Sequence, residues 1–135
     1  MKANKKLSQP IQVGSRMLIP FFTRGGCMRP LLKNGELVFV EPVGMDKIKP
    51  GDCILYRSGG KYFLHRVEKK QENSFMVNDD TGIVGLHKVD FKEVIGRLTA
   101  NHFLSKGRLG LVYSRIIKTI FWFSRSLIQP LFRKF

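Results

Sequence analysis

The sequence contains few of the features that mark disulfide-rich, metal-binding or membrane-spanning proteins. Its 135 residues include two cysteines, too few for a disulfide scaffold, and no group of His and Cys has the spacing of metal ligands. A reducing compartment and no metal or other cofactor are therefore expected. No apolar run approaches the roughly 20 residues that a membrane-spanning helix requires. These absences favour one small domain with a single hydrophobic core.

Acidic residues are scarce and unevenly distributed. The chain has 10 Asp and Glu against 24 Lys and Arg, which gives a formal charge of +14. Residues 1–35 hold seven basic residues and no acid, residues 36–97 hold ten of each, and residues 98–135 hold seven more basic residues and no acid. The flanks therefore carry the excess, which favours a polyanionic partner surface. Nucleic acid is not expected, because no helix-turn-helix, zinc finger or interleaved aromatic platform accompanies the charge.

The N-terminal segment lacks the apolar centre of a secretory signal. Polar residues, a proline and a glycine interrupt its apolar side chains between residues 7 and 22. We therefore expect a cytoplasmic protein, either free or peripheral on the inner face of the membrane. Residues 1–22 are predicted to be a basic arm and lead-in. Within it, residues 12–22 are expected to form a short helix or an irregular segment whose apolar Val13, Met17, Leu18 and Ile19 cover the core.

Between residues 23 and 100 the pattern predicts a small β domain. Short runs rich in β-branched and aromatic residues are separated by turn signals of glycine, asparagine and aspartate. Gly59 and Gly60 supply the positive φ angles that a tight hairpin turn demands. The predicted strands span residues 36–40, 53–57, 61–67, 74–77, 84–88 and 93–98. The expected fold class is therefore mainly β.

One predicted loop places a thiol between flexible and stiff backbone. Gly25 and Gly26 can adopt dihedral angles closed to other residues, and Pro30 fixes its own φ. Cys27 lies between them, on a sharp turn with backbone N–H groups nearby, as a nucleophile and an oxyanion hole require. The alternative is that Cys27 is a small buried apolar side chain, which is the usual role of a single cysteine.

The strand predicted over residues 61–67 carries a histidine on an apolar face. Period-two alternation puts His65 on the same face as Phe63 and Val67. Desolvation on such a face lowers the pKa of an imidazole and favours the neutral form that acts as a general base. The alternative is a buried histidine that is hydrogen-bonded to a backbone carbonyl.

Five short motifs follow one another along the predicted β domain. They read Gly-Cys-Met-Arg-Pro at residues 26–30, Gly-Glu at 35–36, Lys-Pro-Gly-Asp at 49–52, His-Arg-Val at 65–67 and Val-Ile-Gly-Arg at 94–97. Together they resemble the serine–histidine branch of the type I signal peptidase family, which shares its fold with the self-cleaving SOS repressors. The resemblance covers residues 23–98. It departs from the family at the nucleophile, where Cys27 replaces serine, and in the expected lack of an N-terminal membrane anchor.

The resemblance implies a β-barrel-like sheet domain that hydrolyses a peptide bond in a peptide or precursor protein. Cys27 would be the nucleophile and His65 the base and then the acid. A thiol ionises more readily than a hydroxyl, so this replacement can leave a working nucleophile. The larger sulfur can also misalign an oxyanion hole shaped for serine. The alternative is therefore a catalytically inactive relative that binds an extended peptide or acts as a membrane-surface adaptor.

The same resemblance implies the remaining site residues. An aspartate would orient the imidazole, and the register favours Asp80, with Asp79 as the alternative. Gly26, Met28 and Pro30 would contact the substrate. From the residues alone, the two aspartates fit equally well into a surface turn with both carboxylates in solvent.

The C-terminal segment, residues 101–135, is predicted to contain a basic amphipathic helix. Apolar residues recur at intervals of three and four from Leu109 to Leu131, and basic residues lie largely on the other side. Trp122 and Phe123 broaden the apolar stripe. Such a helix suits the boundary of an anionic membrane surface, which residues 109–135 would contact. The alternative is a helix packed on its own domain or on a partner chain.

Overall fold

The computed structural model describes residues 9–23, 35–82, 84–99 and 107–132 together with Leu7 and Leu32, with side chains up to Phe123 in the last range. The strands are β1 (Ile11–Val13), β2 (Arg16–Phe22), β3 (Leu37–Glu41), β4 (Cys53–Ser58), β5 (Lys61–Lys70), β6 (Ser74–Asn78), β7 (His87–Asp90) and β8 (Val94–Leu98). Two 3-10 turns, η1 (Met45–Lys47) and η2 (Phe91–Glu93), and one helix, α1 (Gly107–Phe132), complete the described elements.

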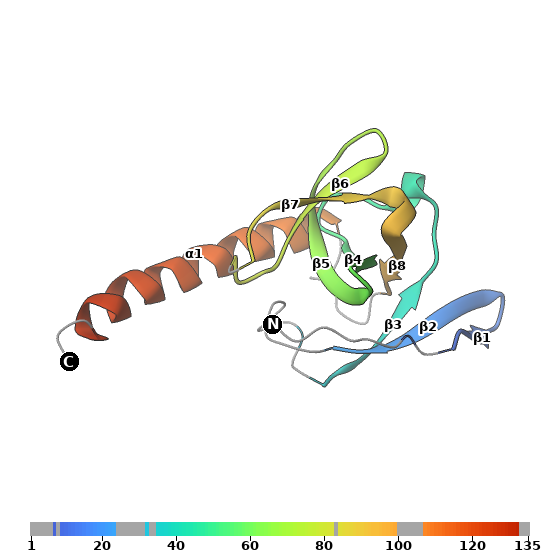
Figure 1. Cartoon of the computed structure of the whole chain (residues 1–135), viewed down its shortest axis with the longest axis horizontal. Coiled ribbons are helices and arrows are strands. Elements are labelled where there is room, and N and C mark those ends of the chain that lie inside the picture. Colours follow the sequence, from blue (N-terminus) through green and yellow to red (C-terminus); the bar gives the residue numbers. More distant parts are fainter. Residues whose placement is uncertain are drawn as a thin grey trace.

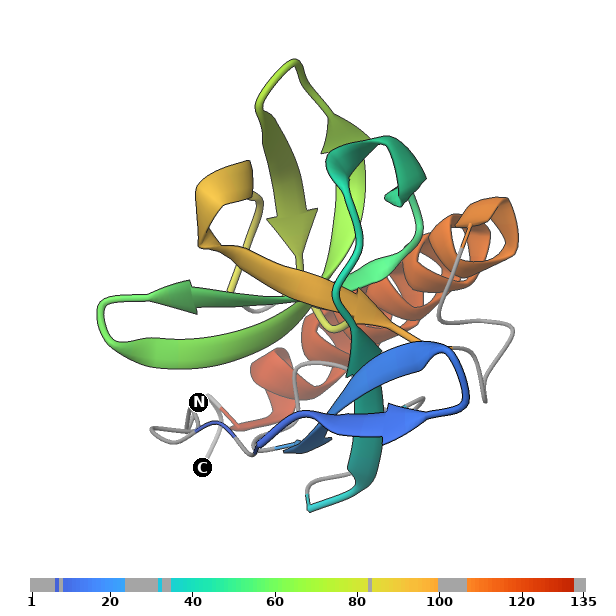
Figure 2. The same cartoon turned by 90° about the vertical axis from the view of Figure 1, so that its right-hand side faces the viewer.

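The eight strands form one antiparallel sheet, which confirms the predicted mainly β class. Their order is β1-β2-β3-β8-β4-β5-β6-β7, so β1 and β7 are the edges and the sheet is not closed. Figure 1 shows the β1–β2 hairpin at one end of the molecule and the distal part of α1 at the other, and Figure 2 shows α1 behind the twisted strands. The central strands β4 and β5 thus lie between a hairpin and a helix.

The N-terminal lead-in is a hairpin, and the prediction of a short helix or irregular segment is wrong. Gly14, with φ of 62°, provides the turn between β1 and β2, and β2 pairs with β3. Ile19 and Phe21 are buried at the two-residue spacing of a strand, whereas Val13 and Met17 are exposed. The lead-in therefore contributes a strand to the core sheet, because its buried residues alternate rather than recur at helical spacing.

The strands β4 and β5 separate two clusters of buried side chains. On one face, Leu55 and Leu64 pack in the cluster that also holds Phe21 and Leu32. On the other face, Ile54 and Tyr56 pack with Val67, Phe75, Val77 and Val89. The hairpin register pairs Ile54 with His65 and Tyr56 with Phe63, so these four side chains share the second face. The predicted hairpin at Gly59 and Gly60 is confirmed, and it sets this register.

The first turn of α1 is attached to the loop before β4. One carboxylate oxygen of Asp52 accepts a 2.9 Å hydrogen bond from the Gly107 N–H, and the other accepts one of 2.8 Å from the Lys49 N–H. A side-chain oxygen at this position satisfies a backbone donor that the helix itself leaves unpaired. Farther along α1, Lys118 forms an ion pair with Glu68 of β5. The helix is thus attached to the β domain at two points, Gly107 in its first turn and Lys118 farther along.

Gly51 gives a direct test of this attachment. Its φ is 95°, and a Cβ at this position would lie 1.6 Å from the carbonyl oxygen of Gly107. We expect Gly51→Ala to displace the start of α1 and lower the thermal unfolding midpoint. Gly59→Ala is the control, because Gly59 also has a positive φ of 58° but nothing lies within 4 Å of its added Cβ. Equal midpoints for the two variants would show that α1 does not depend on this contact.

The side chains of α1 form two faces rather than one apolar stripe. Gly110, Ser114 and Ile117 are buried, so this face packs on the domain. The opposite face carries exposed apolar side chains, between 53% and 62% accessible, at the helical intervals of three and four residues. This exposed stripe consists of Leu109, Val112, Ile116, Ile120 and Phe123. Among the described residues, no helix is both long enough and apolar enough to cross a membrane.

Candidate functional site

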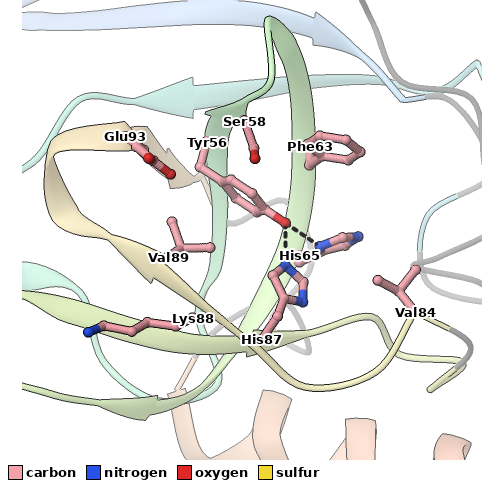
Figure 3. A pocket seen from close by; sticks show the side chains of 9 residues that line it. All are labelled: Tyr56, Ser58, Phe63, His65, Val84, His87, Lys88, Val89 and Glu93. Carbon is pink, nitrogen blue, oxygen red and sulfur yellow. Dashed lines mark hydrogen bonds between the residues drawn. The ribbon is translucent and has the colours of Figure 1, made fainter.

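A pocket opens on the second face of β4 and β5, beside the predicted catalytic histidine. Its volume is about 270 Å³, and its walls come from β4, β5, β7, η2 and the segment before β7. The lining residues, drawn in Figure 3, are Tyr56, Ser58, Phe63, His65, Val84, His87, Lys88, Val89 and Glu93. A mostly apolar pocket with a few convergent polar groups is the usual form of a binding or catalytic site.

His65 is almost fully buried in this pocket, with 1% of its surface accessible. Burial lowers the pKa of its imidazole to about 4, and repulsion from a positive charge on His87 would add to the lowering. The carboxylates of Asp79 and Asp80 raise it by less. The imidazole is therefore neutral at pH 7, which confirms the predicted pKa direction. A buried titratable group with a shifted pKa in a pocket is a functional-site candidate.

A hydrogen-bond chain joins His65 to a second histidine through a tyrosine. The Tyr56 hydroxyl lies 2.8 Å from His65 Nδ1 and 2.7 Å from His87 Nε2. The Nδ1 of His87 lies 3.0 Å from the carbonyl oxygen of Gly85. Figure 3 shows Tyr56 between the two imidazoles, with the second ring nitrogen of His65 pointing away from this chain. The polar group that positions His65 is therefore a neutral phenol.

Asp80 forms a bidentate ion pair with an arginine. Its two carboxylate oxygens accept hydrogen bonds of 2.7 and 2.9 Å from Arg66, and both side chains have no accessible surface. Arg66 also donates to the Gly51 carbonyl at 2.7 Å and lies 5.8 Å from the centre of the Tyr113 ring of α1. Tyr56 is the hydrogen-bond partner of His65 Nδ1, and Asp80 acts on the imidazole through its charge.

Asp79 is also buried, so the alternative of a solvated surface turn is wrong for both aspartates. The Thr81 hydroxyl donates to its carboxylate, and so does the Val84 N–H at 3.1 Å. These contacts shape the segment that leads from β6 to the pocket wall at Val84. Asp79 therefore supports the pocket and reaches His65 through its charge, which raises the imidazole pKa.

Cys27, Gly26, Met28 and Pro30 lie outside the described residues. Residues on either side of this segment are described, and they are hydrogen-bonded to each other. The Thr23 N–H donates to the Glu36 carbonyl at 2.9 Å, and the Gly35 N–H donates to the Thr23 carbonyl at 2.7 Å.

Leu32, which belongs to the same segment, is 1% accessible. It belongs to the core cluster that includes Leu55 of β4 and Leu64 of β5. Leu32 therefore packs on β4 and β5 from the face opposite to the one that carries Tyr56 and His65. The strands on either side of this segment, β2 and β3, are adjacent in the sheet.

Three residues of the site are absent from the sequence predictions. Tyr56 could have been found from the hairpin register, since it is diagonal to His65 across the Ser58–Lys61 turn. Arg66 and His87 have partners that are 14 and 31 residues away along the chain, which no local pattern reveals. Within the described part of the chain, no group of three or more His, Cys, Asp or Glu side chains is arranged to hold a metal ion.

Comparison with known proteins gives no family assignment. No protein-family model matches the chain, and no curated protein matches it in sequence. The function must therefore be argued from the site itself.

Proposed function

We propose that this protein is a signal-peptidase-like endopeptidase that cleaves a peptide or precursor protein, with Cys27 as nucleophile and His65 as general base. The observation that carries the proposal is the buried, neutral imidazole of His65, which faces a pocket and is held at Nδ1 by Tyr56. Its Nε2 points away from that hydrogen bond, as in a histidine that takes a proton from a nucleophile. The order of the five motifs supports Cys27 as that nucleophile.

The proposed reaction proceeds in two halves. His65 Nε2 takes the proton of the Cys27 thiol, and the sulfur attacks the peptide carbonyl carbon. The Cys27 N–H donates a hydrogen bond to the oxyanion, and the imidazolium gives its proton to the leaving amine as the C–N bond breaks. His65 then removes a proton from water, which attacks the thioester. The proton returns to the sulfur, and the carboxylic acid product leaves.

The direct test is cleavage of a proteome-derived peptide mixture by the full-length protein. New peptide termini, identified by mass spectrometry, are expected with the wild-type protein and not with Cys27→Ala. If the wild-type protein retains peptides but creates no new termini, the endopeptidase proposal is wrong and the peptide-binding alternative holds.

A thiol-directed electrophile separates the same two functions without a known substrate. Iodoacetamide is expected to label Cys27 faster than a cysteine in a free peptide, and His65→Gln should remove the difference. Cys53 is the internal control, because burial raises the pKa of its thiol to about 12 and leaves it without accessible surface. Labelling of Cys27 at the free-peptide rate in both proteins would favour the adaptor.

We also propose that the exposed stripe of α1 attaches the protein to an anionic membrane surface. Five exposed apolar side chains gathered on one helix face are typical of a surface that binds a membrane or a partner, and Arg108 and Arg115 lie exposed beside them. The flanks carry all of the excess positive charge, and each basic residue near an anionic surface contributes about 1 kcal/mol. The charge complementarity favours lipid over an uncharged protein partner.

Vesicle flotation tests this attachment with the full chain. We expect Ile116→Gln/Ile120→Gln to lower binding to phosphatidylglycerol vesicles by about tenfold or more, since two half-exposed isoleucines lose their burial in lipid. Ile11→Gln/Val13→Gln, which changes two exposed residues of β1, is the matched control. Equal flotation of all three proteins would contradict the proposal. A double variant that floats normally but loses self-association would assign the stripe to a second copy of the chain.

A further inference from the structure

We infer that Tyr56 and His87 are positioning residues that hold the proton of neutral His65 on Nδ1 and leave Nε2 free to act as a base. The hydrogen-bond chain itself is independent of the proposed function, whereas its role in catalysis rests on that function.

The hydrogen-bond chain begins at a carbonyl oxygen, which can only accept a hydrogen bond. The carbonyl oxygen of Gly85 lies 3.0 Å from His87 Nδ1, so this nitrogen must carry a proton and donate it. A neutral imidazole has one N–H, and His87 Nε2 therefore presents a lone pair. The Tyr56 hydroxyl, 2.7 Å away, donates its single proton to that lone pair.

The direction of the next bond follows. Having donated to His87, the Tyr56 oxygen can only accept from His65 Nδ1, which lies 2.8 Å away. Neutral His65 therefore has its proton on Nδ1 and a lone pair on Nε2. Burial raises the pKa of Tyr56, with smaller contributions from the charges of Glu93 and Asp79, so the phenol keeps the proton that the chain needs.

The Tyr56 hydroxyl orients the imidazole of His65 as a carboxylate would, but it places no negative charge beside the ring. A buried carboxylate at Nδ1 would favour the imidazolium, whereas a phenol leaves His65 neutral over a wide pH range. Packing keeps the three rings in place: the centroid of Tyr56 is 5.7 Å from that of His65 and 6.0 Å from that of His87. The aromatic contacts thus support the geometry that the hydrogen bonds require.

Protonation of His87 would reverse the donor and acceptor roles in both hydrogen bonds of Tyr56. Protonated His87 would donate from Nε2 to the Tyr56 oxygen, and Tyr56 would then donate to His65 Nδ1. The proton of His65 would move to Nε2, where it blocks the base. The charged groups around these rings are Lys88 of β7, Glu93 of η2 and the buried pair Asp79 and Asp80 after β6.

Nitrogen-15 NMR of the histidine side chains in the full chain tests the inference directly. At neutral pH, His65 in the wild-type protein should show a protonated Nδ1 and an unprotonated Nε2. Tyr56→Phe should replace this state by a mixture of tautomers, and His87→Phe should do the same. Tyr62→Phe, which removes a hydroxyl on the other face of β5, should leave the wild-type state unchanged. A wild-type His65 with its proton on Nε2 would overturn the inference, even if no variant folds.

The catalytic consequence has its own readout. Tyr56→Phe is expected to lower the rate of Cys27-dependent cleavage by about 10²-fold, with the amide spectrum still that of a folded protein. If NMR finds the His65 proton on Nδ1 but the protein cleaves no peptide, the proposed peptidase function is wrong and the inference about the proton position holds. If the protein cleaves peptides but His65 carries its proton on Nε2, only the inference about the proton position is wrong.

Discussion

Replacing His65 with glutamine is expected to slow peptide cleavage by about 10²–10⁴-fold, the usual contribution of a positioned general base. His65 is 1% accessible, and glutamine fills a similar volume at this buried position. The glutamine amide can hydrogen-bond with Tyr56, but it cannot take up a proton. The loss should appear at every pH at which the wild-type protein is active. The measurement is the initial rate of appearance of new peptide termini.

Ser58→Ala is the matched control for this experiment. Ser58 lines the same pocket from the turn end of β4 but is not part of the hydrogen-bond chain. Its removal should change the cleavage rate by less than about threefold, because no proton transfer depends on it. A His65→Gln protein that cleaves as fast as the Ser58→Ala protein, while Cys27→Ala does not cleave, would assign the base to another group.

The second large effect is expected on stability, from the buried Arg66–Asp80 pair. Asp80→Ala leaves the Arg66 guanidinium buried without its bidentate partner, and removal of one member of such a pair costs about 3–5 kcal/mol of unfolding free energy. This is a large share of the total stability of a small domain, which is about 5–15 kcal/mol. The measurement is the free energy of unfolding in urea at pH 7.

The control for Asp80→Ala is an exposed ion pair. Arg16 donates to Glu41 at 2.6 Å, but the Arg16 side chain is 54% accessible, so Glu41→Gln should change the unfolding free energy very little. An additional variant, Arg66→Met/Asp80→Leu, should recover much of the loss because it removes both charges of the buried pair. Similar losses for Asp80→Ala and Glu41→Gln would contradict a structural role for the buried pair.

The sequence predicts the parts of the fold that depend on neighbours along the chain. The alternation around His65 predicts its apolar face, and the Gly59–Gly60 turn predicts the hairpin that pairs β4 with β5. The low pKa of His65 follows from that face, because desolvation is its largest cause. These features are local, so one sequence is enough to predict them.

The features that the sequence did not predict depend on contacts between distant segments. Asp80 lies in a turn-like run of polar residues, and only the approach of Arg66 from β5 explains why it is buried. His87 reaches Tyr56 because β7 pairs with β6 at the edge of the sheet. The partners of a buried polar group are therefore the least predictable part of this site.

The helix α1 shows the same limit. Its apolar periodicity predicts a helix, and the structure confirms one over Gly107–Phe132. The periodicity cannot separate the residues that pack on the domain, such as Ile117, from those that stay exposed, such as Ile116. That division depends on the attachment at Asp52 and on the ion pair of Lys118 with Glu68, both of which join distant segments.

The distance between Cys27 Sγ and His65 Nε2 in a crystal structure of the full chain tests the proposed chemistry most directly. We predict a separation of about 3–4 Å, within reach of proton transfer. A sulfur on the Leu64 face of β5, across the sheet from the imidazole, would contradict the proposal that this protein cleaves peptides with a cysteine and a histidine.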